Sequence, residues 1–289
     1  MKTLKKLNIT VLAEDSVLYE SPYLGQHGVS FFVEAIGNEQ KNILIDVGQN
    51  TQALCYNMDL MGINPKEIDA ILLTHCHYDH TQGVSEIIKL IGKKDLPVIA
   101  HPEIFRLNFI TDPFLRHVGI MKQDIKENIE ESGGRLYLTK DPLEIMPGVM
   151  TTGEVKRQTD FEEVGISLKT ITSEGEIKDD LMNDDISFIA NVKDKGIVII
   201  TGCSHSGIIN IVKQSLEYSK ENKIYAIIGG FHLIEANHDK ITKTINSLNE
   251  FDINMICAGH CTGFKAQVEL YNIFKDRFFP LSTGIKLEI

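Results

Sequence analysis

The sequence predicts an α/β fold in which short apolar strands alternate with amphipathic helices. Two observations support this class: β-branched and aromatic runs bounded by glycine, asparagine and charged residues, and other runs with apolar residues at helical spacing. A third is that polar residues directly follow several predicted strands, where layered α/β proteins gather their functional groups. With 289 residues, 43% of them hydrophobic, the chain can bury a substantial core, so we expect a single domain spanning residues 1–289.

The composition excludes several classes of partner. A formal net charge of -11 without a long basic stretch argues against binding to nucleic acid. The apolar patch near residue 10 is too short and too interrupted for a signal peptide, and no run approaches the length of a membrane span. Five cysteines without regular spacing indicate free thiols in a reducing compartment. We therefore expect a cytoplasmic protein with no membrane or nucleic-acid partner, and we predict no particular oligomeric state.

The first third of the chain contains predicted antiparallel strands at residues 7–12, 29–35 and 42–47. The last of them ends in Asp46, whose carboxylate could serve a site or simply stabilise a turn. Residues 51–61 have apolar residues at helical spacing and are followed by Gly62, which predicts a helix. Residues 68–73 are continuously apolar, which predicts a strand buried on both faces.

The stretch THCHYDHTQG follows that strand and places three histidines and an aspartate within six positions: His75, His77, Asp79 and His80. Alternate residues of an extended or tightly turning backbone project the same way, so His75 and His77 can close on one cation while Asp79 and His80 face a second. Imidazole suits zinc, iron and other borderline cations, and a carboxylate adds charge. A polar loop would show this pattern by chance in roughly one sequence per thousand. The stretch therefore predicts a divalent metal site.

The middle of the chain continues the alternation and then loses it. Residues 84–91 are predicted as a helix and residues 97–100 as a strand. Residues 102–146 carry aromatic residues among charges without a clear period, which predicts an insertion packed over the site. Its aromatic residues could line a ligand pocket or cover the domain core, and we favour the core.

Strands return at residues 147–154, 186–192, 196–201, 223–228 and 253–258. Glycine-rich segments after the last three bring further polar residues to strand ends: Cys203 and His205, then His232, then His260. The first of these segments leads into a predicted helix at residues 208–216, so its backbone N–H groups point at one spot. We expect Ser204, Ser206 and Gly207 to bind an anionic group of a ligand there.

Taken together, the HxHxDH stretch, the aspartate before it and the later single histidines resemble the metallo-β-lactamase superfamily over nearly the whole chain. The segments QHGVSFF, ILIDVG, TTGEVKR, TGCSHSGI, GGFHL and GHCTG are more narrowly similar to the branch of dihydropterin ribofuranosylaminobenzene phosphate synthases. This resemblance implies a four-layer αβ/βα sandwich with a metal site at one sheet edge, and a helical insertion at residues 102–146.

The resemblance also implies one or two divalent metal ions, zinc first, with iron or manganese as alternatives. The ligands would form two groups: His75, His77 and either His205 or Cys203 for one ion, and Asp79, His80 and His260 for the other. Cys203 departs from the wider pattern, because relatives carry a bridging aspartate after the Thr-Gly pair. A thiolate there could bridge or bind one ion. Asp79 and His232 are the expected catalytic residues.

Three functions are compatible with such a site. The branch favours a transferase, in which the amine of an aminobenzene ribofuranose phosphate displaces pyrophosphate from a hydroxymethyl-dihydropterin diphosphate and Phe231 stacks on the pterin. General superfamily chemistry favours a metallohydrolase of phosphodiesters, phosphate esters or lactones, with Asp79 as ligand and proton acceptor. A metal-binding module without catalysis is the third. For either enzyme we expect a small anionic substrate.

Overall fold

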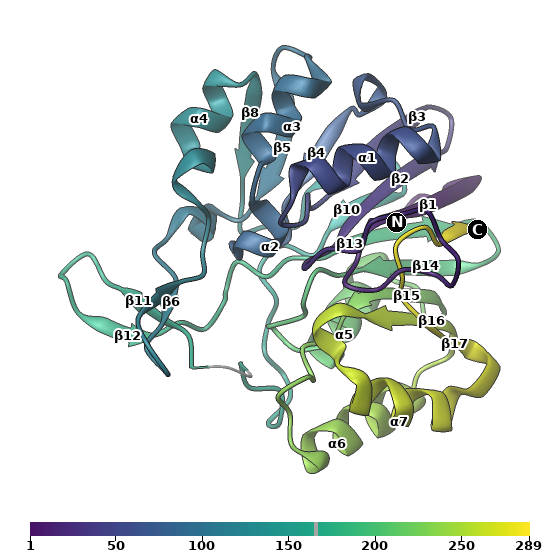
Figure 1. The fold of residues 1–289 in the computed structure, drawn as a ribbon. Coiled ribbons are helices and arrows are strands. Elements are labelled where there is room, and N and C mark those ends of the chain that lie inside the picture. Colours follow the sequence, from purple (N-terminus) through teal and green to yellow (C-terminus); the bar gives the residue numbers. More distant parts are fainter. Residues whose placement is uncertain (165–166) are drawn as a thin grey trace.

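Two seven-stranded sheets pack face to face in the computed structural model, which describes residues 1–164 and 167–289 (Figure 1). The first sheet has the order β18-β1-β2-β3-β4-β5-β8. Its strands are β1 (Lys6–Ala13), β2 (Ser30–Ile36), β3 (Gln40–Ile45), β4 (Ala70–Leu72), β5 (Leu96–Ala100), β8 (Gly134–Leu138) and β18 (Lys286–Glu288). Strands β1, β2 and β3 are antiparallel, whereas β3, β4, β5 and β8 run parallel.

The second sheet repeats this division into an antiparallel and a parallel part. Its strands are β9 (Glu144–Met146), β10 (Val149–Thr151), β13 (Phe188–Val192), β14 (Gly196–Ile200), β15 (Ile224–Gly230), β16 (Ile253–Gly259) and β17 (Phe278–Pro280). Strands β13 and β14 form a hairpin, and β14, β15, β16 and β17 are parallel neighbours. The carboxyl ends of all parallel strands in a sheet meet at one edge, so each sheet presents an edge where loops converge.

Three apolar cores separate the four layers. Alternation along β3 sends Ile43 and Ile45 between the two sheets and Leu44 toward the helices that cover the first sheet. Along β14, Val198 faces the other sheet and Ile199 faces the helices on the outer side. This period-two pattern, with both faces buried, is what a sheet between two layers requires.

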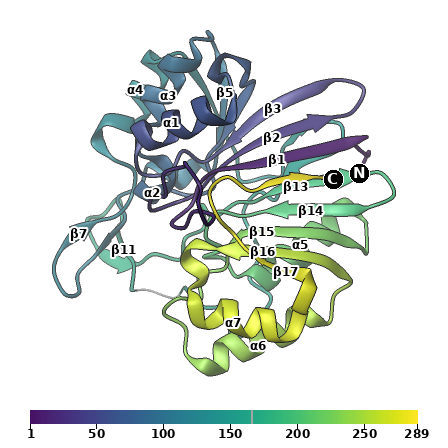
Figure 2. The ribbon, with the colours of Figure 1, turned by 45° about the vertical axis from the view of Figure 1, so that its right-hand side comes forward.

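Helices cover both outer faces of the sandwich (Figure 2). Helices α1 (Thr51–Met61), α3 (Val84–Ile91) and α4 (Lys126–Glu131) lie on the first sheet, and α5 (Ile208–Ser219), α6 (His238–Asn249) and α7 (Phe264–Phe274) on the second. This confirms the predicted four-layer αβ/βα sandwich. No helix within residues 1–164 and 167–289 is long and apolar enough to cross a bilayer.

The segment expected as a helical insertion contains strands as well as α4. A hairpin of β6 (Phe109–Ile110) and β7 (Arg116–His117) joins β11 (Lys169–Ile171) and β12 (Ile177–Asp179) in a small sheet of order β12-β11-β6-β7, which projects from the sandwich (Figure 2). Strand β8 pairs with β5, and β9 pairs with β10. Residues 134–138 and 144–146 therefore belong to the two main sheets, and the part outside them is shorter than residues 102–146.

Candidate metal centre

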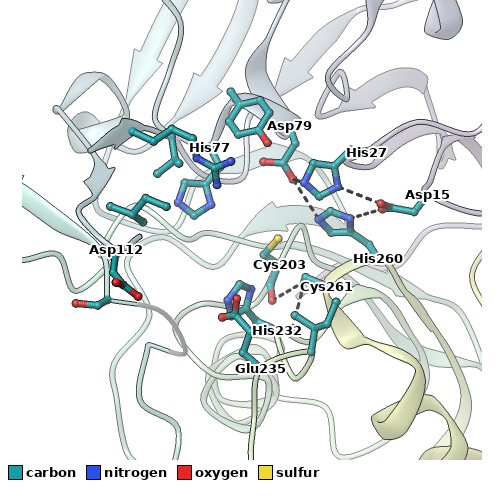
Figure 3. Close-up of a pocket in the computed structure, with 16 residues that line it drawn as sticks. Asp15, His27, His77, Asp79, Asp112, Cys203, His232, Glu235, His260 and Cys261 are labelled. Atoms are coloured by element: carbon teal, nitrogen blue, oxygen red, sulfur yellow. Dashed lines mark hydrogen bonds and ion pairs between the residues drawn. The ribbon is translucent and has the colours of Figure 1, made fainter. Parts of the chain in front are cut away.

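Polar residues from five strand ends meet at one end of the sandwich. They are Asp46 after β3, the run His75 to His80 after β4, Cys203 and His205 after β14, His232 after β15, and His260 after β16. A short helix of one turn, α2 (Tyr78–Thr81), follows His77 and carries Asp79 and His80, both of which are buried. Figure 3 shows His77, Asp79, Cys203, His232 and His260 around one cavity, as the strand-end pattern predicted.

The backbone at these strand ends is strained. Asp46, Ser204, His232 and His260 have φ angles of 55°, 61°, 45° and 50°, a left-handed region that residues other than glycine seldom adopt. Such conformations cost about 1–3 kcal/mol each and cluster at functional sites. Gly202 adds a close approach, because a Cβ atom there would lie 2.2 Å from Oγ1 of Thr74. The fold therefore tolerates unfavourable backbone geometry in order to bring these side chains together.

The first metal group consists of His75, His77 and His205, whose potential ligand atoms all lie within 4.8 Å of one another. The Nε2 atom of His205 is 3.2 Å from Nδ1 of His77. The Nε2 atom of His75 is buried and has no hydrogen-bond partner among the described residues. Three converging imidazole nitrogens, one of them without a partner, fit a divalent cation such as zinc.

The second metal group consists of Asp79, His80 and His260. Oδ2 of Asp79 lies 3.3 Å from Nε2 of His80 and 3.3 Å from Nε2 of His260. One carboxylate oxygen and two imidazole nitrogens thus point at the same place. This donor set also fits a divalent cation, and it matches the second set of ligands that the resemblance implied.

Cys203 lies between the two groups. Its Sγ atom is 3.2 Å from Nε2 of His80, and it lies within 4.8 Å of a ligand atom of His75 and of His205 as well. His205 and Cys203, the two alternatives for the third ligand of the first ion, therefore both lie close enough to His75 to bind the same ion. The position fits a thiolate that bridges two ions or adds charge to one of them.

Most of the ligand histidines are held through their second ring nitrogen, as metal-binding histidines commonly are. These contacts join His80 Nδ1 to Asp46 Oδ2 at 2.7 Å, His260 Nδ1 to Asp15 Oδ2 at 2.6 Å, His77 Nε2 to Asn108 Oδ1 at 3.2 Å, and His75 Nδ1 to Thr74 Oγ1 at 3.1 Å. For His205, Nδ1 is buried without a hydrogen-bond partner in the described chain, and the ring lies 4.1 Å from that of His232. Each of the other four rings therefore turns one fixed nitrogen toward the proposed ions.

Burial dominates the electrostatics of the first group. It lowers the pKa of His75 and His205 well below the usual value and that of His77 to about 3, and the charges of neighbouring imidazoles add to the shifts of His75 and His205. These three histidines are therefore neutral at physiological pH. Neutral imidazole is the form that binds a metal.

The second group is held by opposite charges instead. Burial alone would lower the pKa of His80, but the carboxylates of Asp79 and Asp46 outweigh it and raise this pKa to about 9. Burial would likewise raise the pKa of Asp79, yet His80 and His260 hold it well below its usual range. In the protein alone, this half of the centre is a buried cluster of ion pairs.

A cavity of about 480 Å³ opens onto the metal centre (Figure 3). Its apolar wall is formed by Tyr78, Ile110, Val118 and Ile234. No lysine and one arginine, Arg116 of β7, are among the described residues that line it. His27 also lines it, half-exposed, with Nδ1 3.0 Å from Oδ1 of Asp15 and Nε2 3.6 Å from Oδ2 of Asp79.

The sequence did not predict Asp15, Asn108 and Arg116 as residues of the site. His27 sits in the QHG segment, which was the available signal for it.

The residues expected to bind an anion lie elsewhere and are already bonded. The backbone N–H of Ser206 donates to Oδ2 of Asp185 at 2.8 Å, and the hydroxyl of Ser204 donates to the Gly230 carbonyl at 2.6 Å. The N–H of Gly207 donates to the Ser204 carbonyl at 3.0 Å. None of these three residues is among the described residues that line the cavity. The ligand-binding role predicted for Ser204, Ser206 and Gly207 thus has no support in this geometry.

His232 lines the cavity, but both of its ring nitrogens are buried without hydrogen-bond partners in the described chain. A ligand atom of His232 lies within 4.8 Å of those of Cys203 and His205. This placement beside the first metal group suits a further ligand as well as a catalytic role. The catalytic role of His232 stays a prediction.

Comparison with known proteins agrees with this geometry. Residues 25–155 match the family described as the metallo-beta-lactamase superfamily. A Methanocaldococcus jannaschii protein named 7,8-dihydropterin-6-methyl-4-(beta-D-ribofuranosyl)-aminobenzene-5'-phosphate synthase is 42% identical over 284 residues, covering 96% of this chain and 95% of the relative. This chain belongs to the metallo-β-lactamase superfamily. The predicted family and branch are therefore both confirmed.

Two further proteins resemble the chain over most or all of its length. An uncharacterized protein of Methanocaldococcus jannaschii is 36% identical over 260 residues, covering 89% of this chain and 91% of that protein. The crystal structure of Tm1679, a metal-dependent hydrolase of the beta-lactamase superfamily, matches with a TM-score of 0.81 and 25% identity, covering 98% and 99% of the two chains. Membership of this superfamily indicates a metal-dependent enzyme that binds a divalent cation.

Proposed function

We propose that this protein joins a dihydropterin to an aminobenzene ribofuranose phosphate and releases pyrophosphate, using divalent metal held by the two groups. The observation that carries the proposal is the 42% identity with the synthase over 96% of this chain and 95% of that one. Similarity across nearly the full length of both proteins covers every strand end that contributes to the centre. The transferase is therefore favoured over chemistry typical of the superfamily in general.

The cavity supports a substrate of this class. Its volume of about 480 Å³ is within the usual range for small-molecule sites, roughly 300–1,000 Å³. Tyr78, Ile110 and Val118 offer flat or apolar surface for an aromatic ring system. Arg116 lies on the same wall and offers a guanidinium group, which pairs well with phosphate. In a chain of net charge -11, this arginine is where we expect a substrate phosphate to bind. Phe231, proposed from the sequence to stack on the pterin, is buried instead, with 2% of its surface exposed.

The reaction forms one bond and breaks one. The amine nitrogen attacks the methylene carbon of the dihydropterin diphosphate, the carbon–oxygen bond breaks, its electron pair stays with the diphosphate, and the amine loses a proton. His27 faces the cavity with Nδ1 held by Asp15, so its Nε2 is placed to accept that proton. Divalent cations at the two groups would supply positive charge to neutralise the departing diphosphate.

The direct test supplies metal-loaded protein with the dihydropterin diphosphate, with and without the aminobenzene ribofuranose phosphate. We expect pyrophosphate and the coupled product only when both substrates are present, measured by a pyrophosphate assay and mass spectrometry. No coupled product from the loaded protein would overturn the proposal. His77→Ala should abolish the reaction, because it removes a ligand of the first group.

Arg116 provides a test of substrate binding. Arg116→Ala should raise KM for a phosphate-bearing substrate by about 10–100-fold, since a charged hydrogen bond contributes roughly 1.5–3 kcal/mol. Arg135→Ala is the matched control, because Arg135 is an exposed arginine on β8 that does not line the cavity. An equal effect of the two substitutions would show that general charge, and not Arg116, attracts the substrate.

Hydrolysis is the second candidate function, favoured by the TM-score of 0.81 with a metal-dependent hydrolase. The same assay separates the two, because a hydrolase consumes the diphosphate ester without the amine acceptor. A panel of phosphodiesters, sugar phosphates and lactones extends the comparison. We expect phosphate-bearing compounds to bind better than neutral lactones through Arg116, and dominant lactone turnover would contradict a phosphate-centred site.

A further inference from the structure

Asn108 connects the projecting hairpin to a metal ligand. It lies just before β6 and is fully buried. Its Oδ1 atom is 3.2 Å from Nε2 of His77, and its Nδ2 donates to Oδ2 of Asp180 at 2.8 Å. Residues 102–146 were expected to pack over the site, and one of them directly contacts the metal loop.

Asp180 fixes which way the Asn108 amide points. Burial would raise the pKa of Asp180, but the hydrogen bonds and charge of Arg106 outweigh it, so this pKa lies below its usual value. The guanidinium of Arg106 donates to both carboxylate oxygens, Nε to Oδ2 at 2.5 Å and Nη2 to Oδ1 at 3.0 Å. An ionised carboxylate only accepts hydrogen bonds. The NH₂ group of Asn108 must therefore face Asp180, and its carbonyl oxygen must face His77.

Arg106 also ties this arrangement to the backbone of the metal loop. Its Nη2 lies 2.8 Å from Oδ1 of Asp184, and Oδ2 of Asp184 accepts the N–H of Cys76 at 2.7 Å. Cys76 stands between the two histidines of the first metal group. The side chains of Arg106, Asp180 and Asp184 are 13%, 4% and 0% exposed, so water screens these ion pairs little. The cluster of Arg106, Asp180 and Asp184 thus holds the metal loop at two points. One is the backbone N–H of Cys76, and the other is the ring of His77, through Asn108.

The orientation of the amide decides the tautomer of His77. A carbonyl oxygen accepts but cannot donate, so the proton of the neutral ring must sit on Nε2. The lone pair is then on Nδ1, the atom that lies 3.2 Å from Nε2 of His205 within the first metal group. We propose that Asn108 is a positioning residue that fixes the Nε2–H tautomer of His77 and thereby directs Nδ1 to the metal. This rests on the metal centre proposed above, but not on the identity of the substrate.

The test compares two buried asparagines. Asn108→Leu keeps the volume similar and removes the acceptor for His77. We expect zinc affinity of the first group, measured by chelator competition, to fall by about 10–100-fold, as loss of such an outer partner typically does. Asn57→Leu is the control, because Asn57 is equally buried and, among the described residues, its side chain hydrogen-bonds only to the backbone of Leu12 and Leu24. It should lower stability and leave zinc affinity unchanged.

Two further measurements separate positioning from packing. Nitrogen-15 NMR of the imidazoles should show the Nε2–H tautomer for His77 in the wild type and its loss in Asn108→Leu. The paired substitution N108D/D180N exchanges the carboxylate and the amide, so a carboxylate at position 108 can accept from His77 and from the amide at position 180. The NH₂ group of that amide then replaces the oxygen that accepts from Arg106 Nε, so this one hydrogen bond is lost. We expect N108D alone to bind zinc weakly, because it places two carboxylates together, and N108D/D180N to recover part of the lost affinity.

The outcomes are distinct. Unchanged zinc affinity or an unchanged His77 tautomer in Asn108→Leu would overturn the inference, and so would a folded N108D/D180N that binds no better than Asn108→Leu. Equal loss of affinity in Asn57→Leu would show a general effect of destabilisation. If wild-type protein binds no zinc, the metal centre itself is wrong. If zinc binds as described and no dihydropterin product forms, the inference stands and only the proposed reaction fails.

Discussion

Two groups of candidate metal ligands lie side by side at the cavity, and their surroundings differ in charge. The first metal group, His75, His77 and His205, has no anionic member. The second ring nitrogens of His75 and His77 contact the neutral side chains of Thr74 and Asn108. The second metal group, Asp79, His80 and His260, includes one carboxylate. The second ring nitrogens of its histidines contact the carboxylates of Asp46 and Asp15. One half of the centre is therefore neutral and the other anionic.

This difference bears on how each half would hold an ion. An outer carboxylate makes an imidazole a more basic ligand, and anionic ligands offset the charge of a cation that has left water. The first group has neither advantage, and Cys203 is the residue placed to supply a negative charge to it. We therefore expect the ion of the first group to be the more weakly held and the more dependent on Cys203.

Removal of one ligand from each half should have the largest effect. We expect wild-type protein to hold one to two equivalents of divalent metal, His77→Ala to lose the ion of the first group, and His260→Ala to lose that of the second. Each loss should exceed the roughly 10–100-fold drop in affinity caused by removing an outer partner. Elemental analysis after loading with zinc, iron and manganese in turn measures this. A wild type that stays metal-free contradicts both groups, and loss of all metal from either variant contradicts their independence.

Asp46→Asn should affect the second group selectively. Asp46 is fully buried and accepts from Thr74 N, Thr74 Oγ1 and His80 Nδ1, whereas an asparagine would bring an NH₂ group against one of these donors. We expect about a 10–100-fold loss of affinity for the second ion. The ratio of this loss to that in Asn108→Leu compares the two outer shells directly. Equal weakening of both ions by Asp46→Asn would mean that the halves are one unit.

Cys203→Ser should have a smaller effect that falls mainly on the first ion. The substitution keeps the size of the side chain and removes the thiolate that a cation would favour. We expect folding to be nearly intact and the affinity of the weaker ion to fall by less than in His77→Ala. Cys257→Ser serves as the control, because Cys257 is a fully buried thiol in the core between the sheets. Unchanged stoichiometry and affinity in Cys203→Ser would assign the ligand role to His205 alone.

Asp180→Asn should have the smallest effect of these substitutions. We expect it to change how the free energy of unfolding depends on pH in acid. The pKa of Asp180 is lowered in the folded protein, so the carboxylate stabilises the fold above its unfolded pKa of about 3.9, and this contribution is lost as pH falls through the folded pKa. Asp180→Asn should therefore cost about 1–3 kcal/mol of unfolding free energy at pH 7 and progressively less below pH 4. Urea denaturation across pH measures it. A difference that stays constant down to pH 2 would contradict the ionised state of Asp180.

Local signals in the sequence predicted many elements correctly. Helix α1 has the expected bounds because the side chain of Asn50 accepts the N–H of Ala53 and Gly62 ends the helix with a φ of 71°. Helix α3 also has its expected bounds, between Gly83 and Gly92. His75, His77, Asp79 and His80 could be predicted as metal ligands because their spacing is itself the chemical signal, and the structure places them together at the candidate centre. Where a short local pattern determines a feature, the sequence was sufficient.

Contacts between distant residues could not be predicted in this way. Asn108 and Asp180 are 72 positions apart, and neither belongs to a short motif. The same limit applies at the start of α5: the segment before it was expected to bind an anionic group of a ligand, and the first N–H groups of the helix, at Ile209 and Asn210, donate to Glu162. A helix start predicts that an anion will be bound there. It does not tell whether that anion is a substrate or a side chain of the same chain.

The order of the ligands along the chain has a consequence for the newly made protein. His75 and His77 follow the first sheet's strand β4, whereas His205 and His260 follow strands of the second sheet. A ribosome that has released residues 1–138 has therefore made two of the three residues of each metal group, and His260 emerges 55 residues after His205. Until then the HxHxDH loop can hold an ion only loosely. We therefore expect metal loading to be a late event of biosynthesis, in which the ion would join residues of the two sheets.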